Sequence, residues 1–256
     1  MTPPGITHLT EVGSTNDWLL ARAEILADGH WVIADRQTAG RGRRGRAWGD
    51  GAGNLMASVL VKAEGPVQQL SFVAALALAT ALATALASPG GVAGGESLGT
   101  PTPGPSRQRE GRRILLKWPN DLLLDGKKVS GILLERAGTG LVIGIGLNIA
   151  SFPDGTERPA ISLAAAGLPT PAPIDMLGRL VTAFAEYRAL WETRGFDPIR
   201  TRWLAQAAGL GDRVAARLGT ETLEGRFEGL AADGALTLRL DDDSLRAIHA
   251  GEVFAL

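Results

Sequence analysis

The sequence predicts an α+β fold, with one mixed or antiparallel sheet that carries helices on its faces and a small β-barrel at the C-terminal end. Three observations support this prediction. Short β-prone apolar runs are interspersed with long helical runs up to about residue 208. Beyond Gly209 only short alternating runs separated by turn residues remain, a pattern typical of a small all-β unit. Two of the Asp-Gly pairs, those at Asp125 and Asp233, lie between β-prone runs and predict tight hairpins and therefore antiparallel neighbours.

The first quarter of the chain predicts three strands and one helix. Ser14 is a typical helix N-cap residue, and Asp17 stands three residues later, as the acid of a capping box. A polar stretch rich in glycine and arginine separates the second and third strands. The predicted elements are a strand at 6–12, a helix at 16–26, a strand at 30–35, a loop at 37–53 and a strand at 55–62.

The longest apolar stretch, residues 70–87, predicts a helix that Pro66 opens. Its length of about 18 residues is at the margin of a membrane span. Its alanine, leucine and threonine content, together with polar Gln68 and Gln69 at its start, favours a buried core helix instead. Since the N-terminus also has no basic and apolar secretory signal, we expect a cytoplasmic protein without a membrane partner.

Residues 88–113 change in composition to glycine, proline, serine, threonine and charge, with almost no aliphatic side chains. This composition predicts a flexible surface insertion, with a substrate lid as the alternative. We therefore expect a larger domain at 1–208, interrupted by this insertion, and a barrel at 209–256. About 48 residues are too few for a confident stand-alone core, so the barrel should pack on the larger domain.

The remaining elements follow from apolar periodicity and turn residues. Apolar runs predict strands at 114–118, 122–124, 128–136 and 141–149, and helical periodicity predicts helices at 174–193 and 198–208. Four short alternating runs predict the strands of the barrel, at 213–218, 223–230, 235–240 and 244–249.

Composition excludes several classes of chemistry. The chain has no cysteine, which rules out disulfides, thiolate metal sites and a cysteine nucleophile. It has three histidines, and its one Gly-x-Ser-x-Gly match, at 95–99, lies in a stretch rich in glycine and proline and not between a predicted strand and a predicted helix, so a serine or histidine hydrolase has no support. The formal net charge of −1 means that any attraction to polyanions must come from a local cluster.

Such a cluster lies in the loop at 37–48, where four of the six residues from Arg41 to Arg46 are arginine, separated by glycine. Glycine permits close backbone approach, and guanidinium groups bind phosphate or carboxylate through paired donors. Trp48 adds an aromatic wall. The loop therefore predicts a site that folds around a phosphate-bearing small molecule. A solvated basic loop and an RNA-binding stretch are the alternatives.

Lys117-Trp118-Pro119-Asn120-Asp121 interrupts two apolar runs with a lysine, an amide and a carboxylate. These groups could bind phosphate, a purine edge and Mg²⁺ respectively, or they could simply form a polar turn. Lys128 opens an otherwise apolar strand close to Gly131. It is a candidate for pairing with a carboxylate, or for blocking aggregation at an edge strand.

Two further segments have both a functional and a structural explanation. Gly144 and Gly146 within a strand indicate close approach of a ligand or backbone, or a bulge, and Asn148 after them could contact a base or phosphate. Ser14-Thr15-Asn16 gathers hydroxyl and amide groups where free helix N–H groups are expected, which is also what simple capping requires.

Together, and in this order, these five segments resemble the biotin protein ligases. The pattern is Ser-Thr-Asn, Gly-Arg-Gly-Arg-Arg-Gly-Arg with a following Trp, Lys-Trp-Pro-Asn-Asp, Lys-x-x-Gly-Ile-Leu and Gly-x-Asn, and it covers about residues 6–150. The resemblance implies a catalytic domain like that of class II aminoacyl-tRNA synthetases and an SH3-like C-terminal barrel. It implies biotin and ATP with Mg²⁺ as substrates, and a biotin carboxyl carrier domain of acetyl-CoA carboxylase as partner.

The resemblance also implies roles for individual residues. Arg41, Arg43 and Lys128 would be catalytic. Biotin would be bound by Ser14, Thr15, Asn16, Gln37, Gly40, Arg41, Gly42, Arg43, Lys128, Gly131, Gly144 and Gly146. ATP would be bound by Arg43, Arg44, Arg46, Trp48, Lys117, Asn120, Asp121 and Asn148, with Mg²⁺ held through the phosphates and by Asp121.

Two departures from the family pattern stand out. Gly13 occupies a position where the family often has Asp, and the insertion at 88–113 is longer than usual. Thirteen residues precede Ser14, too few for the winged helix of the repressor members, so we expect a ligase that does not bind DNA. A lipoate or octanoate ligase on the same fold, a nucleic-acid-binding module and an inactive biotin sensor remain as rivals. The oligomeric state is open, since an exposed sheet edge could pair with a second copy.

Overall fold

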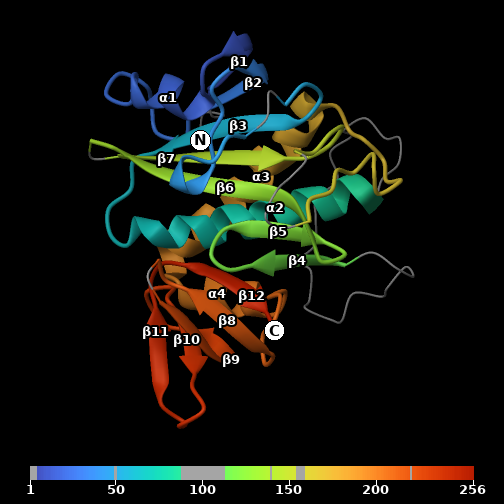
Figure 1. Cartoon of the computed structure of the whole chain (residues 1–256). Coiled ribbons are helices and arrows are strands. Elements are labelled where there is room, and N and C mark those ends of the chain that lie inside the picture. The colour runs from blue at the N-terminus through green and yellow to red at the C-terminus, as the bar shows by residue number, and fades with distance from the viewer. Residues whose placement is uncertain (1–4, 49–50, 88–112, 139, 154–158, 220) are drawn as a thin grey trace.

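The computed structural model describes residues 5–48, 51–87, 113–138, 140–153, 159–219 and 221–256. These residues form a seven-stranded sheet with helices packed on it and a separate five-stranded sheet (Figure 1). The predicted α+β class is therefore confirmed. The predicted insertion at 88–113 lies outside the described residues, apart from Arg113.

The larger sheet is mixed. In spatial order its strands are β1 (Ile6–Val12), β2 (Trp31–Gln37), β3 (Leu55–Val61), β7 (Gly140–Leu147), β6 (Lys127–Ala137), β5 (Asp121–Leu124) and β4 (Ile114–Lys117). β1 and β2 pair in parallel, and the other neighbours pair antiparallel. Between β5 and β6, Asp125 and Gly126 have φ values of 50° and 78°, as a two-residue hairpin turn of this kind requires. The first Asp-Gly prediction is thus confirmed.

Two long helices, α2 (Leu70–Ala87) and α3 (Pro173–Arg194), pack together and build the main core with the larger sheet. A short 3₁₀ turn, Val67–Gln69, precedes α2. The combined segment is long and apolar enough to cross a membrane, but most of it is buried within the molecule. The prediction of a buried core helix is therefore confirmed. The short helix α1 (Thr15–Leu20) packs with Val32, Leu60 and Val142 in a second, smaller core.

The C-terminal sheet is antiparallel, with the order β11 (Leu245–Ile248), β10 (Leu236–Arg239), β9 (Thr222–Leu230), β8 (Arg213–Arg217) and β12 (Glu252–Ala255). The helix α4 (Asp197–Leu204) precedes it. Phe227 and Leu236 belong to the same buried cluster as α2, and the Trp118 indole N–H donates to the Gly234 carbonyl at 3.1 Å. The small sheet therefore packs on the rest of the molecule, as expected for so few residues.

Four local predictions need correction. The helix predicted at 16–26 ends at Leu20. The Arg22 N–H donates to the Leu19 carbonyl, three residues back instead of four, and residues 21–26 form turns. The Asp17 carboxylate does not close a capping box but binds Arg41. The helix predicted at 198–208 ends at Leu204, since residues 206–208 pair with the backbone of Leu116. The sequence pattern also missed the final strand, β12.

Candidate active site

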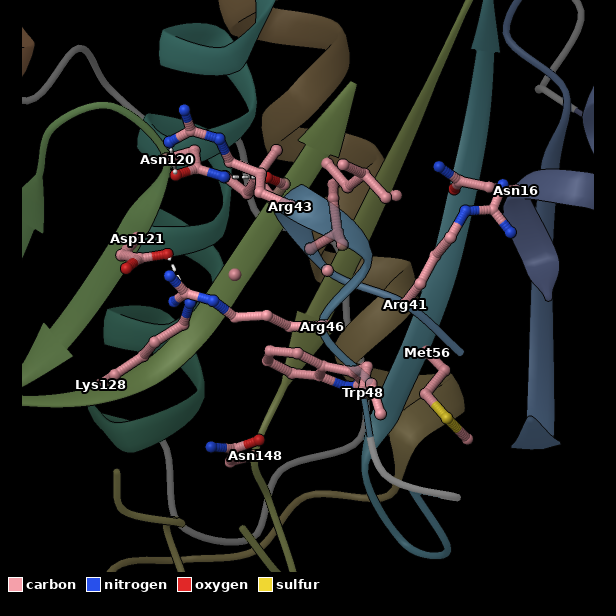
Figure 2. Close-up of a pocket in the computed structure, with 18 of the residues that line it drawn as sticks. Asn16, Arg41, Arg43, Arg46, Trp48, Met56, Asn120, Asp121, Lys128 and Asn148 are labelled. Carbon is pink, nitrogen blue, oxygen red and sulfur yellow. Dashed lines mark hydrogen bonds and ion pairs between the residues drawn. The ribbon is translucent and has the colours of Figure 1, made fainter. Parts of the chain in front are cut away.

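A cavity of about 410 Å³ lies over strands β3, β6 and β7, between the start of α1 and the loop that follows β2 (Figure 2). This volume is within the usual range for small-molecule sites. The structure brings almost all the predicted residues to its lining, namely Ser14, Thr15, Asn16, Gln37, Arg41, Gly42, Arg43, Arg46, Trp48, Lys117, Asn120, Asp121, Lys128, Gly131, Gly144, Gly146 and Asn148. Gly40 lies behind the lining, against the Gln37 side chain. The Arg44 side chain is outside the described residues.

The floor of the cavity is shaped by glycines that face one another across two strands. Gly131 on β6 pairs with Gly146 on β7, and the register continues without a shift along β7. A Cβ atom added at Gly146 would come within 2.6 Å of the Trp48 ring, and one at Gly131 within 3.2 Å. The bulge alternative is therefore wrong here. The glycines are needed because the Trp48 indole lies directly on the strands.

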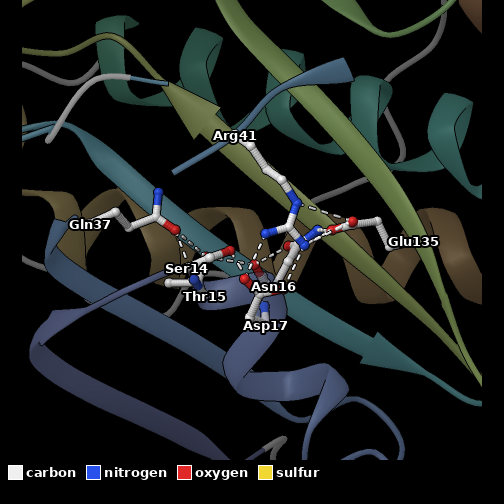
Figure 3. A network of polar contacts seen from close by, with 8 residues as sticks. Ser14, Thr15, Asn16, Asp17, Gln37, Arg41 and Glu135 are labelled. Atoms are coloured by element: carbon white, nitrogen blue, oxygen red, sulfur yellow. Dashed lines mark hydrogen bonds and ion pairs between the residues drawn. The ribbon is translucent and has the colours of Figure 1, made fainter. Parts of the chain in front are cut away.

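The end of the cavity near α1 is lined by buried, uncharged hydrogen-bonding groups, and the charged side chains beside them, Arg41, Asp17 and Glu135, are paired with one another (Figure 3). The Gln37 amide oxygen accepts from the Thr15 backbone N–H at 2.8 Å and from its hydroxyl at 3.0 Å. Ser58, which lies opposite Gly144 on the neighbouring strand, donates to the Asn16 amide oxygen at 2.6 Å. The hydroxyl and amide groups of this end are thus held in fixed orientations, which suits recognition of a neutral polar group.

The opposite end carries cations and amides. Lys128 Nζ lies 2.7 Å from Asp121 Oδ1, so the predicted pairing of this lysine with a carboxylate is confirmed. Arg43 donates to Asn120 Oδ1 at 3.3 Å, and Arg46 binds Glu252 of the C-terminal sheet at 2.7 Å. Such a group of cations suits a ligand with phosphate groups.

Arg43 also donates to the Gly251 carbonyl at 3.4 Å, so the loop contacts both sheets of the molecule. The three loop arginines whose side chains are described, Arg41, Arg43 and Arg46, each bind groups of the protein around the cavity. This arrangement does not favour the nucleic-acid-binding alternative, which needs the loop to present its cations outward.

Asn148 lies at the end of β7 and is held by the segment that follows it. Its amide donates to the Ile161 carbonyl at 3.1 Å. The buried Asn54 side chain accepts from three successive backbone N–H groups, those of residues 149–151, at 2.8–3.1 Å. Asn54 therefore fixes the turn behind Asn148, a contribution that no motif indicated.

Arg41 differs from the other loop cations in its surroundings. Its guanidinium binds the carboxylates of Asp17 and Glu135 near α1, at the far end of the cavity from Lys128 (Figure 2). Hydrogen bonds from Arg41 hold the pKa of Asp17 below its ordinary value, and the same contacts raise the pKa of Arg41.

Sequence reasoning missed Met56, Glu252, Ser58 and Glu135 at or beside the cavity. For Glu135 a signal was available, because Gly131, residue 133 and Glu135 alternate along β6 and so point to one face of the sheet. Glu252 gave no such signal, since it sits in the short final strand that the pattern missed.

Comparison with known proteins agrees with this architecture. Residues 9–149 match the model of the biotin/lipoate A/B protein ligase family, and residues 209–256 match that of the biotin protein ligase C terminal domain. A biotin--[acetyl-CoA-carboxylase] ligase of Paracoccus denitrificans is 40% identical, over 96% of this chain and 98% of the relative. A protein of the same name from Mycobacterium tuberculosis is 33% identical, over 97% and 88%.

Among solved structures, a biotin protein ligase from Aquifex aeolicus in complex with biotin and ATP superposes with a TM-score of 0.77. It has 26% identity, and the match covers 98% of this chain and 97% of that one. Both sequence models, the near full-length relatives and the common fold lead to one conclusion. This chain belongs to the biotin protein ligases of the biotin/lipoate A/B protein ligase family.

Proposed function

We propose that the protein uses ATP to join biotin to a lysine of a biotin carboxyl carrier protein, through biotinyl-5′-AMP. The observation that carries this proposal is the division of one cavity into an uncharged hydrogen-bonding end, a glycine floor and a cationic end. Biotin has a neutral ureido ring at one end and a carboxylate at the other, and ATP brings phosphates to that carboxylate. The names of the relatives supply the acceptor, a carrier domain of acetyl-CoA carboxylase.

In this proposal Ser14, Thr15, Asn16 and Gln37 bind the ureido end of biotin. Its apolar part lies along Gly42, Gly131, Gly144 and Gly146 of the lining, beside the Trp48 indole, while Gly40 contributes from behind the lining by leaving space for the Gln37 side chain. Lys128 and Arg43 lie by the carboxylate and the α-phosphate. The nucleotide occupies the end formed by Arg46, Trp48, Lys117, Asn120, Asp121 and Asn148. Arg44, whose side chain lies outside the described residues, is proposed to bind the nucleotide as well.

The chemistry requires two anions to meet. A carboxylate oxygen of biotin attacks the α-phosphorus of ATP, the bond to the bridging oxygen breaks, and pyrophosphate leaves. Lys128 and Arg43 offset the repulsion between the two reactants and stabilise the charge of the transition state. The acceptor lysine amine then attacks the acyl carbon of the mixed anhydride, and AMP leaves.

The reactive adenylate needs protection from water between these two steps. The loop at 40–48 covers the cavity, and the Trp48 indole closes it against the strand glycines. No protein nucleophile enters the reaction, which suits a chain without cysteine.

Mg²⁺ would enter with the ATP phosphates. Asp121 Oδ1 is buried and lies 2.7 Å from Lys128 Nζ, so it would offer one carboxylate oxygen to the ion by exchanging this partner. The described residues contain no group of three acidic or histidine side chains that could hold a metal by themselves. This donor set fits an ion bound mainly by phosphates and water, whose chemistry would be to neutralise charge on them.

The proposal extends to organisation and location. A catalytic domain at 1–208 and a C-terminal barrel at 209–256 would act together, because Arg43 and Arg46 contact Gly251 and Glu252 across the division. We place the reaction in the cytoplasm and propose neither a DNA nor a membrane partner. A homodimer would use the edge strand β1.

The test is transfer of radiolabelled biotin to a purified carrier domain, with ATP and Mg²⁺. Label on the carrier that depends on the protein and on ATP supports the proposal. Equal transfer of lipoate or octanoate would favour the rival ligases, and biotin binding without release of pyrophosphate would favour the inactive sensor. Lys128→Ala should greatly slow biotin-dependent pyrophosphate exchange; an unchanged rate would remove Lys128 from the catalytic group.

A further inference from the structure

The Arg41 side chain is held by two carboxylates, both at the α1 end of the cavity (Figure 3). Nη1 and Nη2 donate to Asp17 at 2.6 and 2.5 Å, while Nη2 and Nε donate to Glu135 at 2.9 and 3.3 Å. All three guanidinium nitrogens are therefore engaged by the protein. A guanidinium bound in this way adds little net positive charge to the cavity, but it fixes the position of the backbone that carries it.

That backbone is the stem of the loop. Arg41 pairs with Ala47 in an isolated antiparallel bridge, and the Gly42 N–H donates to the Arg46 carbonyl at 2.7 Å. The Trp48 N–H donates to the Gly40 carbonyl at 2.9 Å. The loop is thus a narrow hairpin, whose tip carries Arg43 toward the cationic end of the cavity. Anchoring Arg41 anchors the whole hairpin.

Glu135 has a second partner that Asp17 lacks. Its Oε2 atom accepts from the Asn16 amide nitrogen at 2.6 Å, while the amide oxygen of Asn16 accepts from Ser58 at 2.6 Å. A carboxylate accepts hydrogen bonds only, so it determines which way the Asn16 amide points. Ser58 Oγ also lies 2.8 Å from Thr15 Oγ1, so Ser58 links the orientation of the Asn16 amide to that of the Thr15 hydroxyl.

We propose that Asp17 and Glu135 are positioning residues that anchor the stem of the loop through Arg41, and that Glu135 alone also orients Asn16 for the ligand. The anchoring part stands on the structure of the loop, whereas the ligand part rests on the proposed function. Arg41 then anchors the loop, and Lys128 and Arg43 neutralise the charge of the two reacting anions.

Anchoring can be tested without any ligand, by trypsin cleavage after Arg43, Arg44 and Arg46, with mass spectrometry to locate the cuts. Cleavage tracks the population of open loop when opening is fast. Glu135→Gln and Asp17→Asn should each raise the rate at these sites at least about fivefold. The control is Glu11→Gln, which breaks the exposed Glu11–Arg36 pair at 3.0 Å on β1 and β2 and should leave the rate unchanged. Rates within twofold of the wild type in both test variants would overturn the anchor.

Orientation of Asn16 is tested by calorimetry with biotin in the absence of ATP. Glu135→Gln should weaken binding at least tenfold, equivalent to about 1.4 kcal/mol, because it disturbs Asn16. Asp17→Asn should stay within about twofold, because it touches Arg41 and not Asn16. Equal effects of the two variants would overturn the separate role of Glu135.

Two measurements keep the outcomes distinct. Thermal unfolding of each variant identifies general loss of structure. Glu135→Asp keeps the charge but shortens the side chain by one methylene, so it should raise loop cleavage and weaken biotin binding less than Glu135→Gln does. A wild-type protein that binds no biotin would refute the proposed function and the Asn16 role together, whereas the cleavage experiment would still decide the anchor.

Discussion

The substitution Gly144→Ala provides a quantitative test of how the uncharged end of the cavity is built. A Cβ atom at this position would lie 2.4 Å from Asn16 Oδ1, whereas an ordinary contact begins at 3.4 Å. The Asn16 amide must therefore move outward by about 1 Å or rotate. Either movement breaks its contacts with Ser58 and Glu135, both at 2.6 Å.

The size of the effect follows from those two hydrogen bonds. Each contributes about 1 kcal/mol net within a protein. Loss of both predicts about 2 kcal/mol, or roughly a 30-fold increase in the Kd for biotin, if the amide must be returned to its place for binding. We expect the larger part of this change in biotin affinity rather than in the rate of adenylate formation, because Lys128 lies at the other end of the cavity.

Isothermal titration with biotin, without ATP, measures the change directly. Gly13→Ala is the matched control, because a Cβ atom at Gly13, one residue before Ser14, meets no atom within 4 Å. Biotin binding by Gly144→Ala within twofold of the wild type would refute the reasoning, since the amide would then not be required in its present position.

Three further predictions follow. Gly146→Ala would place a Cβ atom 2.6 Å from the Trp48 ring and displace the ring, so the KM for ATP should rise several-fold, as steady-state kinetics can show. Arg43→Gly should release biotinyl-AMP into solution, because the loop tip loses its contacts with the residues around it; an unchanged dissociation rate of the adenylate would contradict this. The Asp17 carboxylate, whose pKa Arg41 lowers, should stabilise the fold fully above about pH 4 and progressively less as the pH falls below it. The Tm difference between wild type and Asp17→Asn should therefore shrink in acid, and a difference that grew there would contradict the assignment.

Much of the fold was predictable because local signals and tertiary structure agree. The strand Ile6–Val12 was predicted with the residues that the structure gives it, and the turn at Asp125 has the positive φ angles that its sequence demands. Where the prediction was wrong, tertiary contacts decided the outcome. The helix expected to run to residue 208 ends at Leu204, because the backbone of residues 206–208 pairs with Leu116 on the edge strand β4.

The site was predictable to the extent that its residues occur in short motifs. What the motifs could not give is which polar side chains meet across the sheet. Asn16 and Glu135 are 119 residues apart, and their contact depends on the register of β6 with β7 and on the placement of α1. Arg41 and Arg43 belong to the same motif, but Arg41 binds Glu135 at one end of the cavity and Arg43 binds Asn120 at the other.

The pairing of the cavity's cations has a kinetic consequence. Arg41, Arg46 and Lys128 each hold a carboxylate of the protein already, so the electric field that reaches into solution is weaker than the number of cations indicates. An incoming polyphosphate must displace the carboxylates from Arg46 and Lys128 at short range, whereas Arg41 keeps its partners as the anchor of the loop. Encounter with the nucleotide should consequently depend less on added salt than the number of cations indicates, and selectivity should arise from the exchange of partners after the ligand has arrived.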